Sequence, residues 1–178
     1  LFVELVEALH SLSPSADSAY YLGILKDKAG NTNEAIAFYE ESLSLESDAY
    51  RKAEILYKIA AKLKKRGLKS KARKYANEAL SNKPSMGKAY ILIAGLYAES
   101  ANDCGNNQFE KQAVYWLAAQ TARRAAIVDP SLKKTSQKLE ASYSGRAPSK
   151  TDIFTQGKAG EVISIECWIR SSVTVPNL

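Results

Sequence analysis

The chain has 178 residues, of which 46% are hydrophobic, and 25 Lys and Arg against 19 Asp and Glu give it a net charge of +6. No apolar run approaches the roughly 20 residues that a membrane-spanning helix needs, so no membrane span is predicted. With one histidine and two cysteines, the sequence has no cluster with metal-ligand spacing, and it contains no Gly-x-Ser-x-Gly motif and no phosphate-binding loop. This composition argues against an enzyme, and we expect no cofactor, no metal and no small-molecule substrate.

Residues 1–14 are predicted to form one amphipathic helix. Leu5 and Leu9 fall on one helical face, and they lie 34 residues before Tyr39 and Leu43, which occupy the same places in the next segment. We therefore expect this helix to be the second helix of a further repeat, with its first helix upstream.

Residues 15–49 and 50–84 carry the same pattern at a spacing of 37 residues. The matching positions are Leu22, Gly23, Gly30, Ala35, Tyr39 and Leu43, followed by Ile59, Ala60, Gly67, Ala72, Ala76 and Leu80. Small residues at these places let two antiparallel helices approach closely, and Gly30 and Gly67 allow the left-handed conformation that ends a helix. Each segment is predicted to be one helix pair.

Residues 85–130 are predicted to form a third, enlarged pair. Ile93 follows Ile59 by 34 residues, whereas Ala118 follows Ala72 by 46. We place the 12 additional residues at about 100–108, where the sequence has turn-forming residues and no apolar period. The insertion is interpreted either as a ligand-contacting loop or as a tolerated surface insertion.

The repeated pattern resembles the tetratricopeptide repeat (TPR). The residues that carry the resemblance are Ala19-Tyr20-Tyr21-Leu22-Gly23, Gly30-Asn31, Glu34-Ala35-Ile36, Phe38-Tyr39 and Ser42-Leu43. The resemblance implies an all-α protein built as a right-handed α-α superhelix, with about three helix pairs and a preceding single helix.

In this family the first helices line a concave surface that binds a peptide or a protein segment. On that surface we place Asp17, Tyr20, Tyr21, Ile24, Lys28, Glu54, Tyr57, Lys58, Ala61, Lys65, Lys88, Ile91 and Leu92. Members that hold the C-terminal carboxylates of a chaperone present a Lys with an Asn one turn later. Here Tyr20 and Ile24 occupy those places, which favours a mixed apolar groove over a carboxylate clamp.

The C-terminal part is predicted to contain a capping helix over residues 131–144 and an extension over 145–178. In the extension we expect a linker, a short turn capped by Ser149, and a strand in which Ile163, Ile165, Cys167 and Ile169 alternate with polar residues. Val173 and Val175 are predicted to form its hairpin partner. Because an isolated hairpin is marginal, it must pack on the last helices or on another subunit, and self-association through these strands is left open.

Three short segments resemble a group of envelope-associated repeat proteins of Gram-negative bacteria: Cys104-Gly105, Pro148 to Phe154, and Cys167-Trp168-Ile169. This resemblance implies export to the periplasm or cell envelope, with the cytoplasm as the alternative. In an exported protein, Cys104 and Cys167 can form one disulfide. The alternative is two unrelated thiols, one buried on the strand and one in a loop.

Positive charge is concentrated in residues 51–74, which contain eleven Lys or Arg and a single acid. This basic patch comprises Lys62, Lys64, Lys65, Arg66, Lys69, Lys71, Arg73 and Lys74. It is interpreted as a solvated helix surface or as a site for an acidic partner, either a protein or an anionic polymer. Nucleic acid is less favoured because stacking aromatic residues are not interleaved with the charges.

Catalytic residues are not predicted. His10 and the carboxylates Glu46 and Asp48 are expected on exposed helix surface. The sequence therefore favours a non-catalytic scaffold that binds a protein segment, as part of a larger envelope protein or assembly. The alternatives are a structural or self-associating module and a basic-patch binder of an acidic partner.

Overall fold

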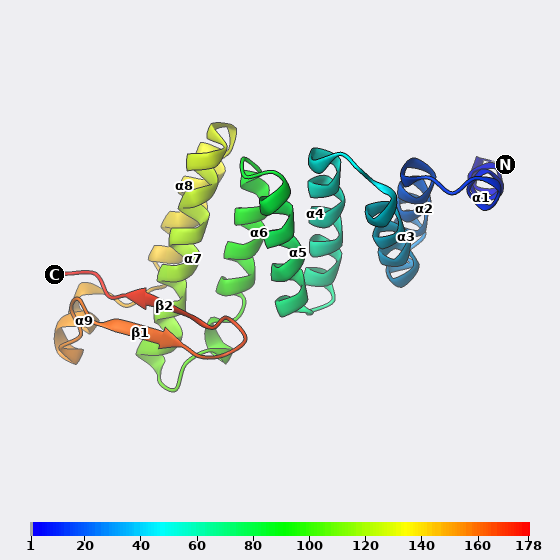
Figure 1. Cartoon of the computed structure of the whole chain (residues 1–178). Coiled ribbons are helices and arrows are strands. Elements are labelled where there is room, and N and C mark those ends of the chain that lie inside the picture. The colour runs from blue at the N-terminus through cyan, green and yellow to red at the C-terminus, as the bar shows by residue number, and fades with distance from the viewer. Residues whose placement is uncertain (1) are drawn as a thin grey trace. The chain divides into compact units, whose positions relative to one another are not determined.

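The computed structural model describes residues 2–178, so Leu1 lies outside the described part of the chain. The chain divides into two compact units, Leu1–Pro84 and Ser85–Leu178. The first unit contains five helices among its described residues, coloured blue to green in Figure 1: α1 (Phe2–Leu12), α2 (Ala16–Lys28), α3 (Thr32–Leu45), α4 (Ala49–Lys65) and α5 (Lys69–Asn82). Helix α2 packs on α3, α4 packs on α5, and α3 also contacts α4.

The two helix pairs begin and end where their sequences favour a cap or a reversal. Ser15 and Ser18 form a capping box at the start of α2, and the Asp48 side chain accepts a hydrogen bond from the Arg51 N–H at the start of α4. Gly30 and Gly67 have φ angles of +83° and +72°, which are accessible to glycine with little strain. Each glycine thus turns the chain back into the second helix of its pair.

The two pairs fill their interhelical contact differently. In the first pair the Tyr39 ring packs against Gly23, where an added Cβ would lie 2.6 Å from two ring carbons. Tyr39 is 1% exposed. In the second pair the matching residues are Ala60 and Ala76, both fully buried. A close contact between two helices can thus be filled either by a large side chain packed against a glycine or by two alanines.

Helix α1 packs on α2 and leaves an apolar stripe exposed. Leu5, Leu9 and Leu12 are 66%, 57% and 85% exposed. Tyr39, which the repeat pattern aligns with Leu5, is buried by contrast. The face of α1 that corresponds to the buried face of α3 is therefore uncovered in the structure.

The second unit contains α6 (Gly87–Ala98), the short helix η1 (Ala101–Asp103), α7 (Gln108–Val128), η2 (Pro130–Leu132), α8 (Lys133–Ser144), α9 (Lys150–Gln156), β1 (Val162–Ile165) and β2 (Ser171–Thr174). Helix α7 contacts α6, α8 and both strands. Its 21 residues give it an N-terminal portion on which the C-terminal hairpin packs (Figure 1).

The predicted C-terminal β segment is confirmed as a two-stranded antiparallel hairpin, in which Ile163 pairs with Val173 and Ile165 with Ser171. The predicted length of its first strand was wrong. Pairing stops at Ile165, and residues 166–169 form a turn, so Cys167 and Ile169 lie outside the strand. Arg170 has a φ of +45°, which reverses the chain into β2.

The apolar side of the hairpin is part of the core of the second unit. Its residues pack with the N-terminal part of α7 and with α9, in a cluster that includes Phe109, Val114, Trp116, Ile153, Ile163, Ile165, Ile169, Val173 and Val175. The opposite side carries Ser164, Ser172 and Thr174, which are exposed. Burial against α7 thus supplies the support that an isolated hairpin lacks.

Candidate functional site

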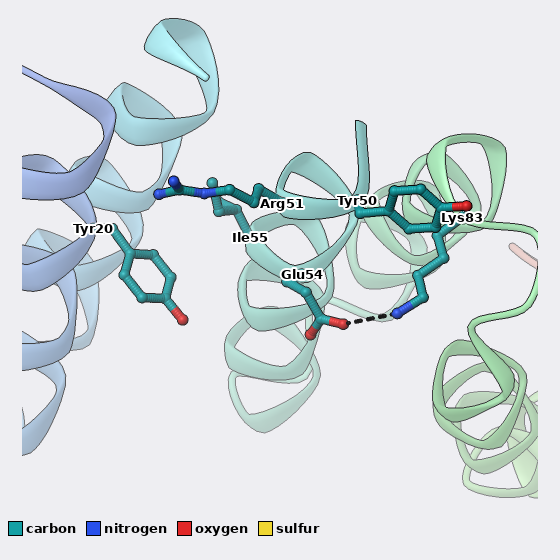
Figure 2. A pocket seen from close by; sticks show the side chains of 6 residues that line it. All are labelled: Tyr20, Tyr50, Arg51, Glu54, Ile55 and Lys83. Carbon is teal, nitrogen blue, oxygen red and sulfur yellow. Dashed lines mark ion pairs between the residues drawn. The ribbon is translucent and has the colours of Figure 1, made fainter. Parts of the chain in front are cut away.

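A pocket of about 300 Å³ lies within the first unit, between α2 and the N-terminal half of α4. It is lined by Tyr20, Tyr50, Arg51, Glu54, Ile55 and Lys83 (Figure 2). Tyr20 and Glu54 belong to the surface predicted from the sequence, whereas the other four residues were not predicted. Through Tyr20 and Glu54, the pocket belongs to the predicted binding face.

The lining residues that sequence reasoning missed lie mainly on the first turns of α4. Helix α4 has 17 residues, whereas α2 has 13, and the additional turn carries Tyr50 and Arg51. The sequence contains a signal for this turn, since the first two repeats are 37 residues apart while a TPR has 34. Three additional residues are close to one helical turn.

Arg51 is held by carboxylates on two sides. Its guanidinium pairs with Asp17 on α2, and its Nε lies 2.8 Å from Glu46 Oε2, in the loop before α4. The Glu46 side chain is only 7% exposed, and its Oε1 accepts hydrogen bonds from the N–H groups of Ser47 and Asp48 at 2.9 and 3.0 Å. The expectation that Glu46 lies on exposed helix surface was therefore wrong, because Glu46 caps the loop and balances Arg51.

Lys83 is the second cation of the pocket, and it also has a carboxylate partner. Its Nζ lies 3.5 Å from Glu54 Oε1 and 5.7 Å from the centre of the Tyr50 ring (Figure 2). The second distance falls within the range of a cation–π contact. Lys83 thus bridges Tyr50 and Glu54 at one side of the pocket.

Tyr20 is held in position by neighbouring rings and a lysine. Its ring centre lies 5.8 Å from that of Tyr39 and 6.2 Å from that of Tyr21, and Lys58 Nζ lies 5.5 Å from it. Ile55 supplies an aliphatic wall and is 3% exposed. The rings and this side chain give the pocket a largely apolar lining.

The other predicted surface residues of the first unit differ in exposure. Tyr21, Lys28 and Lys65 are exposed, and Asp17 is exposed and paired with Arg51, while Ile24, Tyr57, Lys58 and Ala61 are half-buried. Burial and, secondarily, the charge of Glu54 raise the pKa of Tyr57. Their role in binding stays a prediction.

Lys88, Ile91 and Leu92 belong to the second unit. Leu92 is 6% exposed, and Lys88 and Ile91 are half-buried. Leu92 therefore offers a partner little surface within its own unit. Their role in binding also stays a prediction.

The basic patch surrounds the turn between α4 and α5. Lys62 pairs with Asp27 on α2, and Lys74 Nζ lies 3.9 Å from Glu78. Lys65, Arg66, Lys71 and Lys74 are exposed, while Lys62, Lys64, Lys69 and Arg73 are half-buried. The first turn of α5 contains no acidic residue, and its N-cap, Leu68, makes no side-chain cap. The positive end of this helix therefore adds to the positive potential of the patch.

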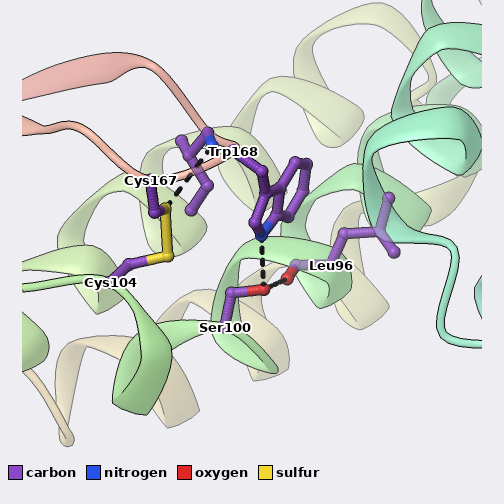
Figure 3. Close-up of a disulfide and its surroundings, with 6 residues drawn as sticks. Leu96, Ser100, Cys104, Cys167 and Trp168 are labelled. Atoms are coloured by element: carbon purple, nitrogen blue, oxygen red, sulfur yellow. Dashed lines mark hydrogen bonds between the residues drawn. A yellow bond between two sulfur atoms is a disulfide. The ribbon is translucent and has the colours of Figure 1, made fainter.

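Cys104 and Cys167 form a disulfide in the structure, with their Cα atoms 5.4 Å apart. Of the two alternatives that the sequence left open, the structure contains the bonded one. Next to it, the Trp168 indole N–H donates to Ser100 Oγ at 3.1 Å, and that hydroxyl donates to the Leu96 carbonyl at 2.8 Å (Figure 3). The disulfide and this chain of hydrogen bonds tie the hairpin turn to α6 and to the loop before α7.

His10 is half-buried, in contrast to its predicted surface position. Its Nδ1 lies 2.8 Å from Ser18 Oγ, and its Nε2 lies 3.1 Å from Glu41 Oε1. The three groups are arranged like a serine–histidine–acid triad, but Ser18 is only 5% exposed and its hydroxyl donates to the Ser15 carbonyl at 3.1 Å. The hydroxyl is therefore inaccessible to a substrate, and the three residues join α1, α2 and α3.

Over residues 2–178, no group of three or more His, Cys, Asp or Glu side chains is arranged to hold a metal ion. Among the same residues, every helix is too short or too polar to cross a membrane.

Comparisons with known proteins identify relatives and similar folds. No protein-family model matches the chain. It is 31% identical over 112 residues to the photosystem I assembly protein Ycf3 of Cuscuta gronovii and to that of Cuscuta obtusiflora, which covers 58% of this chain and 67% of each relative.

Solved structures with a similar fold are TPR domains or proteins of comparable architecture. The TPR2B domain of yeast Sti1, solved as a complex with pHsp70, has a TM-score of 0.59 at 20% identity and covers 74% of this chain and 97% of its own. The Arabidopsis OM64 TPR domain has a TM-score of 0.56 at 20% identity, covering 72% and 93%. MamA has a TM-score of 0.57 at 21% identity, covering 74% and 64%.

These similarities confirm the predicted fold class, a mostly helical TPR-like superhelix with a short C-terminal hairpin. Domains of this fold are typically non-catalytic and mediate interactions between proteins. On the strength of the repeat pattern, the fold and the identity to its relatives, the chain belongs to the tetratricopeptide-repeat family.

Proposed function

We propose that this chain is a non-catalytic interaction module that binds a segment of another protein, in a larger envelope protein or assembly. The observation that carries the proposal is the pocket formed by Tyr20, Tyr50 and Ile55 on the predicted binding face. Aromatic side chains in such pockets often provide most of the binding energy of an interface. A pocket of about 300 Å³ is at the small end of ligand sites and suits one anchoring side chain.

The names of the relatives support a protein partner. One is an assembly protein, and a TPR domain of similar fold was solved with pHsp70. The identity of the partner does not carry over, because this chain has Tyr20 and Ile24 where a carboxylate clamp would have Lys and Asn.

A peptide-display selection on the immobilised full chain tests the proposal. We expect it to enrich peptides whose binding falls at least about tenfold in the Tyr20→Ala/Tyr50→Ala variant, a loss typical of hot-spot residues. Phe154→Ala and Ile127→Ala serve as matched controls, since both residues are exposed apolar side chains of the other unit. Peptides that bind all variants equally, or no enrichment at all, would contradict the proposal.

Self-association is a second candidate function, and the exposed leucines of α1 favour it. We expect any dimer to use Leu5 and Leu9 rather than the strands, because the apolar side of the hairpin is already buried against α7. Light scattering on a Leu5→Ser/Leu9→Ser variant tests this candidate. A dimer that persists in this variant and is lost on removal of residues 161–178 would assign association to the strands instead.

Binding of an acidic partner is a third candidate, supported by the exposed Lys65, Arg66 and Lys71 around an uncapped helix start. Poly-glutamate is a suitable probe, and its binding should weaken steeply with added salt. Reversing these three charges should abolish it, whereas reversal of the exposed Lys133 and Lys134 in the second unit is the matched control. Binding that is insensitive to salt would exclude the electrostatic interpretation.

A periplasmic or envelope location is the accompanying proposal, with the cytoplasm as the alternative. The Cys104–Cys167 disulfide supports it, because structural disulfides persist in oxidising compartments. Trapping the cysteines with an alkylating reagent at the moment of cell lysis tests it. Two alkylated thiols in the native host would favour the cytoplasm.

A further inference from the structure

We propose that the pocket of the first unit accepts an uncharged aromatic side chain of the bound segment and disfavours a carboxylate. This inference rests on the proposed function, since it names the chemistry of the anchor that the pocket would hold. It concerns Tyr20, Tyr50, Arg51, Glu54 and Lys83, together with Ile55.

The cations of the pocket are already neutralised by the protein itself. Arg51 pairs with Asp17 and Glu46, and Lys83 pairs with Glu54, so three carboxylates surround two cations. A ligand carboxylate would have to displace one of these partners or lie beside Glu54. Both alternatives are unfavourable, because the first leaves a charge without its partner and the second brings like charges together.

Displacement is most costly at Arg51. Glu46 is 7% exposed at its side chain, and its Oε2 makes no hydrogen bond among the described residues, so Arg51 is the group that balances this oxygen. Moving Arg51 toward a ligand would leave a buried carboxylate oxygen unpaired. Arg51 is therefore fixed in place by Glu46 and is not available as a carboxylate clamp.

The lining suits an aromatic ring. Tyr20 and Tyr50 present rings to the pocket, and Ile55 adds an aliphatic surface (Figure 2). A third ring can pack edge-to-face or offset against the tyrosines. Arg51 and Lys83 can also interact with its π-face while they keep their carboxylate partners. A branched aliphatic side chain would gain only the apolar contacts.

The volume of the pocket and the fixed position of the Tyr20 ring are consistent with this anchor. A cavity of about 150 Å³ is enough to bind benzene, so about 300 Å³ accommodates an indole or phenol ring. Tyr20 is already held by Tyr39 and Lys58, with ring-centre distances of 5.8 and 5.5 Å. Because that ring does not have to be ordered on binding, little conformational entropy is lost.

The test is a methyl NMR titration of the full chain, observed at the Ile55 methyl groups. The probes are N-acetyl-tryptophanamide, N-acetyl-leucinamide and the amide of N-acetyl-aspartate, each at millimolar concentrations. We expect saturable shifts with tryptophanamide and at least about tenfold weaker binding of the aspartate probe. Shifts that are as strong with the leucine or the aspartate probe, or no shift with tryptophanamide, would overturn the inference.

Three variants make the result specific. Tyr20→Ala should lose the tryptophanamide response, whereas Phe154→Ala, which changes an exposed aromatic residue of the second unit, should keep it. Glu54→Gln removes the carboxylate beside Lys83 with little change of shape, so it should strengthen binding of the aspartate probe relative to that of tryptophanamide. An unchanged aspartate response in Glu54→Gln would contradict the charge argument.

The inference and the proposed function fail in different ways. Displayed peptides that require Tyr20 and Tyr50 but contain no aromatic residue would refute the anchor and support the binding module. Conversely, tryptophanamide shifts at Ile55 without any enriched peptide would support the pocket chemistry and count against the module.

Discussion

Reduction of the Cys104–Cys167 disulfide should destabilise the second unit by about 4 kcal/mol. The two cysteines are 63 residues apart, and the chain-entropy relation for a loop of that length gives about 4 kcal/mol at 25 °C. The bond joins the hairpin turn to the loop before α7, next to the core cluster that holds the hairpin on that helix. A loss of this size is a large part of the roughly 5–15 kcal/mol that stabilises a typical domain.

Tryptophan fluorescence measures this effect in the intact chain. The protein has two tryptophans, and both Trp116 and Trp168 lie in the second unit. The free energy of unfolding of a small protein falls by roughly 1–3 kcal/mol per molar urea. A loss of about 4 kcal/mol should therefore lower the urea midpoint of this unit by about 1 to 4 M. Circular dichroism reports the helices of both units, and the part of its transition that belongs to the first unit, which contains no cysteine, should be unaffected by the reductant.

The matched control is the Cys104→Ser/Cys167→Ser variant. It should resemble the reduced protein and show no response to reductant. The reasoning is refuted if reductant leaves the midpoint of the oxidised protein unchanged, or if protein purified under oxidising conditions carries two alkylatable thiols.

Three further predictions concern the packing and ionisation of individual residues. Gly23→Ala should destabilise the first unit by about 1–3 kcal/mol in urea unfolding, because the new methyl group would overlap the Tyr39 ring; a variant as stable as the original chain would contradict this. Ala60→Gly should cost about 2 kcal/mol, from the helix propensity of glycine and the loss of a buried methyl group. Burial raises the pKa of Tyr39 to about 12, so the folded state retains its proton longer than the unfolded state. The contribution of the protonated Tyr39 to the free energy of unfolding should be complete below about pH 10 and lost as the pH rises toward 12. Tyr39→Phe should flatten this dependence of stability on pH. Ser100→Ala should shift the Trp168 emission and cost about 1 kcal/mol, since it removes the acceptor of the indole N–H; an unchanged spectrum would exclude the hydrogen bond.

The helix pairs could be predicted because their signals are local and repeated. Gly30 and Gly67 end the first helices, and alanines at matching places mark the contacts between helices. The extent of β1 could not be predicted in this way. Cys167 and Ile169 continue the alternation of the strand, but the disulfide to Cys104 and the contact of Trp168 with Ser100 place them in a turn. These contacts span more than 60 residues, and sequence periodicity contains no information on them.

The candidate site could be predicted only in part, for a related reason. The family pattern assigns Tyr20 and Glu54 to the binding face, but Tyr50 and Arg51 have no counterpart in that pattern. Lys83 comes from the end of α5, which the pattern treats as outside the surface. Burial of Glu46 was also missed, because a charged residue between two helices is ordinarily exposed.

The additional turn of α4 connects these unpredicted features. It places Arg51 where one side chain reaches Asp17 on α2 and Glu46 in the loop before α4, so the guanidinium links the first helix pair to the second. It also places Tyr50 beside Lys83. A repeat of 34 residues would lack this turn, and with it one ring and one cation of the pocket. The departure of the chain from the regular TPR length thus creates the pocket. Because the charge pairs that anchor the turn already occupy its cations, the pocket has no unpaired cation among its described lining residues for a ligand carboxylate.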